Sequence, residues 1–510
     1  MTEGESSIPG APVSSHLPAE DLSVLSDEHV GTRVIRGGAQ RAVGLVVANL
    51  FTAGSALILL RYLGVDAFGR YGTVLALVGV VYGISDMGLT VTGTRELALC
   101  STPEEQRDML GHILGLRIVV TTIGVLIAVA FATLAGYEQA EVVGTALAGF
   151  GTLLQSVQAA MLLPLGVRLR NGVLAVNQVL TQAVLLLGFG LLAAAGAGLV
   201  PFFAVQILVG VALLAATPLM LARTDFVLPH WSAQRIRTLA RVGLPVAIAT
   251  ILGVLYLRIL VIIMSLVSGR PSQVGYYVTS TRVLELVGGL PFLVVAVVLP
   301  VVTVAARDDH ERLVYMTSRI AQAMALVGVL VALLLWTLAG PIIAVFGGPE
   351  YAPAAAVLQI QGFASITIFL TAAWQPALVA MHRLRALAIS MITGVAAVVI
   401  AGLILIPPFQ AQGAAVAAVI GDTVLCGAVY VAIRGGKTGD WLPAEGVLRI
   451  AGAAVPAVAA GLIPGLPSVV RAVLVAGVFV AVAALLRAIP SELTDALSTA
   501  VRRLPIISLR

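Results

Sequence analysis

Charged residues are scarce in this sequence. Asp, Glu, Lys and Arg make up 11% of its 510 residues, whereas 59% are hydrophobic and the mean hydropathy is +1.04. A soluble domain carries about 25% charged residues, because its surface must face water. The shortage therefore excludes the three or so soluble domains that the length alone would suggest, and it places most of the surface in a medium other than water.

Cysteine and recognisable catalytic motifs are also in short supply. The two cysteines, Cys100 and Cys426, lie too far apart for metal-ligand spacing and allow at most one disulfide, so we interpret them as small apolar packing residues. The chain has no Walker loop, no H-E-x-x-H and no G-x-S-x-G. We therefore expect no catalytic residues, no metal and no cofactor: the chain is not an enzyme, and alone it is not an ATP-driven pump.

The apolar residues gather in stretches long enough to cross a bilayer. A membrane-spanning helix needs about 20 apolar residues, and such stretches recur along the whole chain. They predict an all-α, polytopic membrane protein of about fourteen transmembrane helices. The last two, separated by Pro464 to Pro467, alternatively form one re-entrant hairpin. The predicted spans lie near 42–61, 71–91, 113–136, 142–163, 173–195, 199–221, 243–267, 283–304, 320–345, 355–378, 386–406, 412–433, 448–466 and 469–487.

The basic residues test this count, because cytoplasmic loops are enriched in Lys and Arg. With a cytoplasmic N-terminus, twenty-three of the thirty basic residues fall on the cytoplasmic side, and two, Arg117 and Arg258, fall inside spans. This asymmetry predicts that both termini are cytoplasmic. The basic residues are scattered over short segments, so no nucleic acid is expected as a partner. The remaining five, on the external side, are Arg61, Arg70, Arg270, Arg282 and Arg471.

The polar segments predict the domain organisation. Residues 1–38 lack the basic flank and apolar core of a signal peptide, and we expect a disordered cytoplasmic tail. The longest loop, 222–242, is a predicted cytoplasmic linker between six-helix lobes at 39–221 and 243–435. An extra helix pair and a cytoplasmic tail occupy 436–510. A weak internal repeat supports two parallel halves, since Gly69-Arg70-Tyr71 corresponds to Gly275-Tyr276-Tyr277.

Several motifs resemble those of polysaccharide flippases. Arg61 to Tyr71 reads RYLGVDAFGRY, and Phe346 to Leu358 reads FGGPEYAPAAAVL. Asp86-Met87-Gly88-Leu89 with Arg95-Glu96-Leu97-Ala98, and Gly413-Ala414-Ala415, complete a set that keeps the order of that family. The family belongs to the multidrug/oligosaccharidyl-lipid/polysaccharide exporter superfamily.

The resemblance implies two lobes that form a V around a central cavity, with two additional C-terminal helices. It also implies an undecaprenyl-pyrophosphate-linked oligosaccharide as substrate. The sequence departs from the family at one point. Where the family often has an arginine, an apolar residue and an aspartate in the seventh helix, this chain has Arg258-Ile259-Leu260. A coupling or charge-balancing role for that carboxylate is therefore in doubt here.

Arginines inside or beside the membrane are the candidate head-group ligands. A charge at the centre of a membrane helix costs at least about 2.5–3.5 kcal/mol on insertion scales, so it should face protein or a wet cavity. Guanidinium groups bind phosphate bidentately. We therefore expect Arg258, Arg117, Arg282 and Arg61 to bind a pyrophosphate, with Arg61 and Arg282 at the outer ends of spans one and eight.

The alternative is structural ion pairing. Arg282 and Glu285 have i, i+3 spacing, and Asp86 and Arg117 lie at similar depth. Glu285, Asp86 and Asp422 are thus candidates for charge balance or coupling. Asp422 has no obvious partner in the sequence, and it is either a hydrogen-bonded core acid or a cavity group.

Neutral polar residues inside the spans are candidate ligands for sugar hydroxyls. Asn49, Gln155, Gln158 and Tyr256 are the predicted polar cavity wall, because they supply donors, acceptors and an aromatic ring for stacking. The alternative is ordinary hydrogen bonding between helices.

Together these observations predict a flippase of the bacterial inner membrane. It would move a lipid-linked oligosaccharide across the bilayer by alternating access for cell-surface polysaccharide synthesis. Its expected partners are this substrate, the lipid bilayer, and the polysaccharide polymerase and glycosyltransferases of the pathway. The alternative is a cation-coupled multidrug antiporter of the same superfamily. The absence of Asp and Glu from the first span favours the flippase, because antiporters of the superfamily resemble one another in using acids within the lobes.

Overall fold

The computed structural model describes residues 28–86, 88–168, 170–221, 227–230, 233–291, 310–435, 439 and 441–489. Every regular element among them is a helix, which confirms the predicted all-α class. The first part contains α1 (Glu28–Asp86), α2 (Leu89–Leu99), α3 (Pro103–Leu134), α4 (Gln139–Met161), α5 (Leu163–Val167), α6 (Asn171–Ala194) and α7 (Leu199–Met220). The remainder contains α8 (Ala233–Val267), α9 (Pro271–Gly288), α11 (His310–Gly347), η3 (Pro349–Tyr351), α12 (Ala354–Gly362), α13 (Ala364–Ala380), α14 (Leu384–Arg434), α15 (Ala444–Gly461) and α16 (Ser468–Leu485).

The described helices account for thirteen of the predicted spans. Eleven are long and apolar enough to cross a membrane. Two of these hold two predicted spans each: non-helical backbone divides α1 at Gly64 and α14 at Gln410. The eighth predicted span, 283–304, extends beyond the described residues after position 291. The chain is therefore a multi-pass membrane protein, and the helices of the described residues agree with the predicted spans.

The connections at one end of the bundle are tight turns with a left-handed residue. A positive φ is easily adopted by glycine, which has no β-carbon. Because these turns alternate with the spans, they all lie at the same end, which we call the outer end after the sidedness predicted from the arginines. The seven positions are Gly64, Gly136, Gly196, Gly269, Gly348, Gln410 and Gly465.

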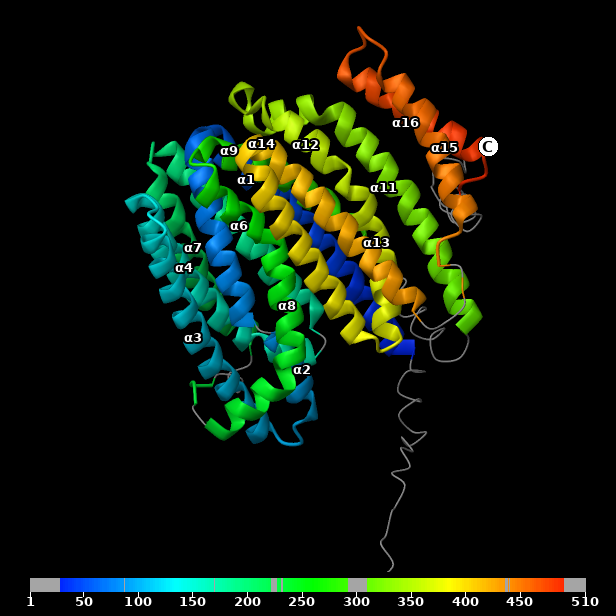
Figure 1. Cartoon of the computed structure of the whole chain (residues 1–510). Coiled ribbons are helices and arrows are strands. Elements are labelled where there is room, and N and C mark those ends of the chain that lie inside the picture. The colour runs from blue at the N-terminus through cyan, green and yellow to red at the C-terminus, as the bar shows by residue number, and fades with distance from the viewer. Residues whose placement is uncertain are drawn as a thin grey trace, which may run out of the picture.

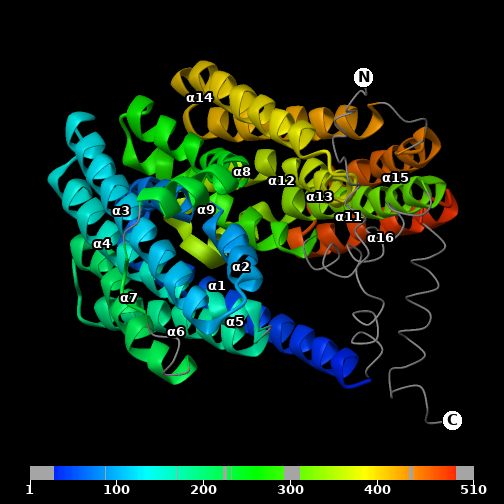
Figure 2. The same ribbon diagram turned by 90° about the horizontal axis from the view of Figure 1, so that it is seen from below.

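The helices form two groups joined along α1, α8 and α9 (Figures 1 and 2). In the first group, α4 packs on α7 and α3, and α6 packs on the first part of α1. In the second, α14 packs on α8 and α13, and α11 packs on α13. Figure 1 shows α1, α9 and α14 together at the top, with α11 and α13 leaning away from α3 and α4 toward the bottom. We call these groups the first and second halves.

The predicted internal repeat meets at this junction. A β-carbon added to Gly69 would lie 2.0 Å from the carbonyl oxygen of Pro271 and 2.9 Å from the amide nitrogen of Gly275. A β-carbon on Gly275 would lie 2.4 Å from the carbonyl oxygen of Val65. Such distances exclude a side chain at either position without movement of the backbone. The two repeat glycines therefore allow α1 and α9 to cross in backbone contact.

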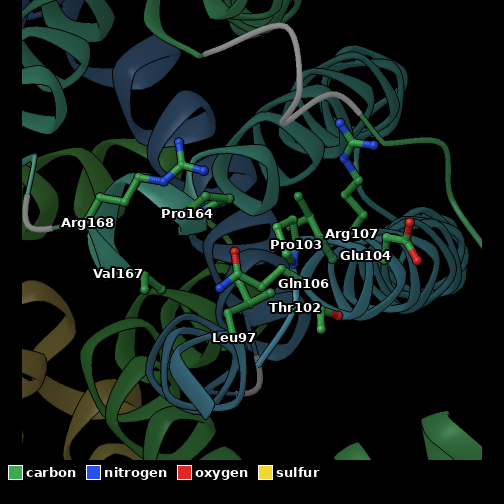
Figure 3. A pocket seen from close by; sticks show the side chains of 10 residues that line it. Leu97, Thr102, Pro103, Glu104, Gln106, Arg107, Pro164, Val167 and Arg168 are labelled. Atoms are coloured by element: carbon green, nitrogen blue, oxygen red, sulfur yellow. The ribbon is translucent and has the colours of Figure 1, made fainter. Parts of the chain in front are cut away.

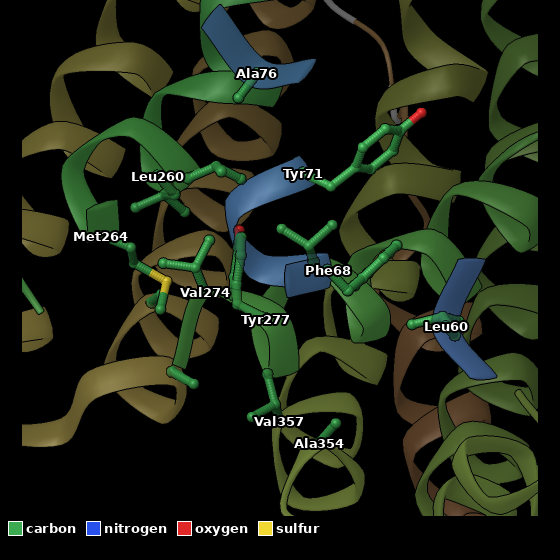
Figure 4. Close-up of a cluster of buried hydrophobic side chains, with 14 of the residues drawn as sticks. Leu60, Phe68, Tyr71, Ala76, Leu260, Met264, Val274, Tyr277, Ala354 and Val357 are labelled. Atoms are coloured by element: carbon green, nitrogen blue, oxygen red, sulfur yellow. The ribbon is translucent and has the colours of Figure 1, made fainter. Parts of the chain in front are cut away.

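One hydrophobic core runs through the junction. It joins Phe68 and Tyr71 of α1 to Leu260 of α8, Tyr277 of α9 and Val357 of α12, all buried (Figure 4). Tyr71 also stacks on Phe203 of α7, with ring centroids 5.5 Å apart. The halves are thus packed together near the outer end in this conformation.

The C-terminal pair packs as a separate layer against α11. A second core cluster joins Ala325 and Leu333 of α11 to Ile450 of α15 and Phe479 of α16. Each of the two terminal helices has 18 residues and qualifies as a membrane span. At 1.5 Å per residue this is about 27 Å, close to the hydrocarbon thickness of about 30 Å. The structure therefore favours two spans over a re-entrant hairpin.

The ends of two elements differ from the sequence prediction. Helix α1 begins at Glu28, inside the tail predicted to be disordered over 1–38, and residues 1–27 lie outside the described part of the chain. Extending an existing helix costs little compared with nucleating one, so the span continues into polar sequence. Helix α9 begins at Pro271, before the predicted start of the eighth span at residue 283. This second difference relocates a candidate site residue.

Candidate substrate site between the halves

A stripe of small residues on α1 faces the second half. Its members are spaced three and four apart, so they lie on one side of the helix. A β-carbon at Gly72 would lie 2.9 Å from Val278 Cγ2 of α9, and one at Gly83 would lie 2.6 Å from Val254 Cγ2 of α8. The halves therefore meet at closer range than larger side chains would permit. The stripe consists of Gly69, Gly72, Ala76, Gly79 and Gly83.

A charged triad lies against this stripe. Arg258 of α8 and Arg282 of α9 share one carboxylate, that of Glu285, at N–O distances of 3.3 Å and 2.9 Å. The stem of Arg258 crosses Gly79, where an added β-carbon would lie 3.4 Å from Nε. Among the described residues, Glu285 is the one acidic residue that forms an ion pair with Arg258 or Arg282. The triad therefore carries a net charge of +1 at the junction of the halves.

Arg282 lies deeper in the protein than the sequence indicated. Because α9 begins at Pro271, Arg282 is about three turns inside the helix and does not lie at its outer end. The polar residues before it suggested a loop. In the structure they are buried and bonded: Thr279 donates to the Gly275 carbonyl at 2.7 Å, and Ser280 donates to Gln361 of α12.

A second layer of polar contacts supports the triad. Gln361 is fully buried, accepts a hydrogen bond from Ser280 and donates one to Thr281 Oγ1 at 3.1 Å. These bonds hold α9 against α12 immediately before Arg282. The sequence analysis identified neither the role of Gln361 in holding α9 nor the glycine stripe. The heptad-like spacing of glycines in α1 was the signal that could have identified the stripe.

The triad is accessible but has little free space beside it. Its three side chains are between 28% and 32% exposed. The cavity bounded by the triad, Gly72 and Ala76 measures about 10 Å³, which is room for about one water molecule. A pyrophosphate does not fit there without movement of the halves or of Glu285.

Arg117 has a different environment. It is 1% exposed, pairs with Asp86, and donates to Thr90 Oγ1 at 2.8 Å and to the Ser156 carbonyl at 3.3 Å. These contacts tie α3 to α1, α2 and α4 within the first half. This geometry matches the alternative interpretation of Arg117 and Asp86 as a structural ion pair. Arg117 is not brought together with the triad.

Asp422 and Tyr256 form a pair inside the second half. The Tyr256 hydroxyl of α8 donates to Asp422 Oδ1 of α14 at 2.5 Å. The tyrosine lies against Gly394 and Gly421, where added β-carbons would be 3.5 Å and 3.3 Å from its ring and hydroxyl. Tyr256 thus faces α14, whereas Arg258, two residues further along α8, faces α1 and α9. The structure supplies the partner that the sequence did not reveal.

The remaining candidates lie away from the triad. At the outer end, the Arg61 guanidinium donates to the Val345 carbonyl at 2.8 Å and so connects the two halves. Within the first half, Gln155 donates to Gln206 Oε1 at 3.1 Å, and Gln158 donates to Asn177 Oδ1 at 2.8 Å. These are bonds between helices. Asn49 is exposed on α1.

Three solved structures have the same fold. "Lipid II flippase MurJ, inward closed conformation" aligns with a TM-score of 0.70 at 12% identity, covering 87% of this chain and 98% of that chain. A multidrug resistance MATE family transporter of the MOP superfamily aligns in its inward-facing conformation with a TM-score of 0.61 at 13% identity, covering 77% and 97%. An outward-facing conformation described in the same words aligns with a TM-score of 0.52 at 15% identity, covering 79% and 94%.

Sequence comparison adds a family to this fold. No curated protein matches the chain in sequence. Residues 58–356, which are more than half of the chain, match the family model described as polysaccharide biosynthesis protein. This match agrees with the resemblance to polysaccharide flippases of the MOP superfamily, and the solved structures with this fold are a flippase and transporters. The chain therefore belongs to the polysaccharide biosynthesis protein family.

Proposed function

We propose that this protein is a flippase that moves an undecaprenyl-pyrophosphate-linked oligosaccharide across the bacterial inner membrane by alternating access. The observation that carries the proposal is the charged triad, in which two guanidinium groups share one carboxylate at the junction of two membrane-embedded halves. A positive charge inside a membrane protein costs free energy unless an anion balances it. A pyrophosphate head group is such an anion.

In the substrate-free protein, the carboxylate of Glu285 would occupy the position that the phosphate of the substrate takes when it binds. Its two carboxylate oxygens accept hydrogen bonds from Arg258 and Arg282, one from each. A phosphate offers the same kind of acceptor with more negative charge, and arginine pairs with it bidentately. We propose that the head group displaces Glu285 from one or both arginines. The solved structures with this fold are a flippase and transporters, which supports a role of these residues in binding and release.

Contacts at the outer end support an inward-open or closed starting state. Arg61 bonds to the Val345 carbonyl, and Tyr137 bonds to Ser265 Oγ at 2.6 Å, so both join the halves near the outer turns. The TM-score is higher for the inward-facing transporter, 0.61, than for the outward-facing one, 0.52. In the proposed cycle the substrate enters from the inner end. The halves then separate along the stripe on α1, and the substrate leaves at the outer end.

A cation-coupled multidrug antiporter is the second candidate. The Asp422–Tyr256 pair supports it, because a half-buried carboxylate beside a hydroxyl can bind a cation or a proton. The likeness of fold to multidrug transporters supports it too. The triad has no comparable role in binding a cationic drug, because its net charge would repel it. We therefore place the flippase first.

The test is Arg258→Ala in the native host, read out as surface polysaccharide. We expect export to be lost with the protein level unchanged, and lipid-linked oligosaccharide to accumulate on the cytoplasmic leaflet. Arg95→Ala is the matched control, because Arg95 is an exposed arginine on α2 outside the triad. Normal export by the Arg258 variant would reject the proposed site. Unchanged polysaccharide with altered drug resistance after gene deletion would favour the antiporter.

A further inference from the structure

A large pocket lies at the inner end of the first half, away from the triad. It measures about 710 Å³ and lies where the ends of α2, α3 and α5 come together (Figure 3). This volume is within the range of small-ligand sites. Its walls come from three segments: Leu97 of α2, Thr102 to Leu110 at the start of α3, and Pro164 to Arg168 around α5.

The wall of this pocket has two kinds of surface. Leu97 and Leu110 are each 2% exposed and form an apolar part together with Pro103, Pro164 and Val167. The polar part contains Arg107 and Arg168, which Figure 3 shows on opposite sides of the two prolines. Two guanidinium groups outnumber the one lining carboxylate, that of Glu104. The lining residues therefore offer both guanidinium groups and apolar surface to a ligand.

Hydrogen bonds fix the backbone that carries the two exposed arginines. The amide of Arg168 donates to the Pro164 carbonyl at 3.0 Å, which closes the one-turn helix α5. Arg107 follows a capped helix start, because the Thr102 hydroxyl accepts from the Glu105 amide at 3.2 Å. Each arginine also contacts another protein group, so a phosphate would bind beside or in place of that contact.

The pocket is at the depth of lipid head groups. Helix α3 has 32 residues, and at 1.5 Å per residue it is about 48 Å long, longer than the hydrocarbon layer of about 30 Å. Its first turns carry Glu104, Glu105 and Arg107, so we place these turns beyond the apolar layer at the inner end. Basic pockets between transmembrane helices at this depth are a known form of anionic-lipid recognition.

We infer that this pocket binds the head group of an anionic phospholipid from the inner leaflet. The phosphate would lie between Arg107 and Arg168, and the glycerol and the first acyl carbons would contact Leu97, Leu110 and Val167. This site is separate from the triad and does not depend on the proposed substrate. Because α2 also packs against α8 of the second half, the bound lipid would connect the membrane to the contact between the halves.

Binding of dioctanoyl phosphatidylglycerol to the purified full-length protein in a zwitterionic detergent tests this inference. We expect the double variant R107Q/R168Q to bind at least about tenfold more weakly, because it loses two charge-assisted contacts. The matched control is R95Q/R170Q, which removes two exposed arginines near the same end that do not line the pocket. We expect it to bind within about twofold of wild type.

A second variant guards against misfolding as the explanation. Val167→Trp fills the apolar part and leaves both arginines in place, so it should also weaken binding while the unfolding temperature stays near that of wild type. Dioctanoyl phosphatidylcholine and farnesyl pyrophosphate are the comparison ligands. Wild-type affinity in R107Q/R168Q, or an equal loss in R95Q/R170Q, would overturn the inference. Binding of farnesyl pyrophosphate or phosphatidylcholine with no binding of phosphatidylglycerol would overturn it as well.

Discussion

A disulfide across the junction is the sharpest perturbation that the structure offers. Gly72 of α1 and Val278 of α9 face each other, and a β-carbon at position 72 would lie 3.4 Å from the β-carbon of Val278. Disulfides join β-carbons about 3.5–4.5 Å apart. Changing Val278 to cysteine also removes the γ-carbon that would approach the new β-carbon most closely. Gly72→Cys with Val278→Cys should therefore cross-link with a shift of a few tenths of an ångström.

The size of the effect follows from the proposed cycle. If the halves must separate along the stripe, a cross-linked molecule cannot reach the outward-open state, however strongly a substrate favours it. Export should then fall in proportion to the cross-linked fraction, so that about 90% cross-linking leaves about a tenth of the rate. A reductant should restore the rate.

The assay compares surface polysaccharide before and after mild oxidation, with the cross-linked fraction measured by maleimide labelling. The background replaces the two native cysteines, Cys100 and Cys426, which are free in the structure. The matched control is Val125→Cys with Gly149→Cys. It has the same β-carbon separation of 3.4 Å but joins α3 to α4 inside the first half. Full export by the oxidised junction variant would refute alternating access along this interface.

Three further predictions concern charged residues that lie between the helices. Arg117→Met should lower stability by about 3 kcal/mol, because it leaves Asp86 partly buried without its partner; thermal unfolding in detergent measures this, and adding Asp86→Asn should recover part of the loss. Glu285→Gln should strengthen binding of farnesyl pyrophosphate and slow export, because Arg258 and Arg282 both lose the carboxylate that competes with a phosphate. Weaker binding would contradict the proposal that Glu285 occupies the position of the phosphate. Asp422→Asn and Tyr256→Phe should each reduce export by up to about tenfold, because each removes the charge-assisted hydrogen bond that joins α8 to α14; normal export by either variant in the polysaccharide assay would show that transport does not need the pair.

The fold was largely predictable because the membrane imposes a simple rule on sequence. Each span needs about 20 apolar residues, and alternate loops carry arginine. The prediction weakened where polar residues are buried. The segment that leads to Arg282 contains Thr279, Ser280 and Thr281, which resemble loop residues until their partners are known. Their hydroxyls bond within α9 and to Gln361, so the helix begins at Pro271.

The candidate site was predictable in part. An arginine in the interior had to have a function or a partner, so Arg258 was identifiable from its position alone. Its partner, Glu285, comes from another helix, and only helix packing brings the two together. The pairing of Arg282 with Glu285 was predictable, because i, i+3 neighbours lie on one face of a helix. The pairing of Tyr256 with Asp422 was not, because the two residues are far apart in the sequence.

The seven tight outer turns have a consequence for biogenesis. A short turn closed by one left-handed residue brings little polar chain across the hydrocarbon layer, so each pair of adjacent spans can enter the bilayer as a hairpin. Helices inserted in this way satisfy their backbone hydrogen bonds before they meet other pairs. The polypeptide would thus be integrated two helices at a time, and the contacts between distant hairpins, including those across α1, would form last.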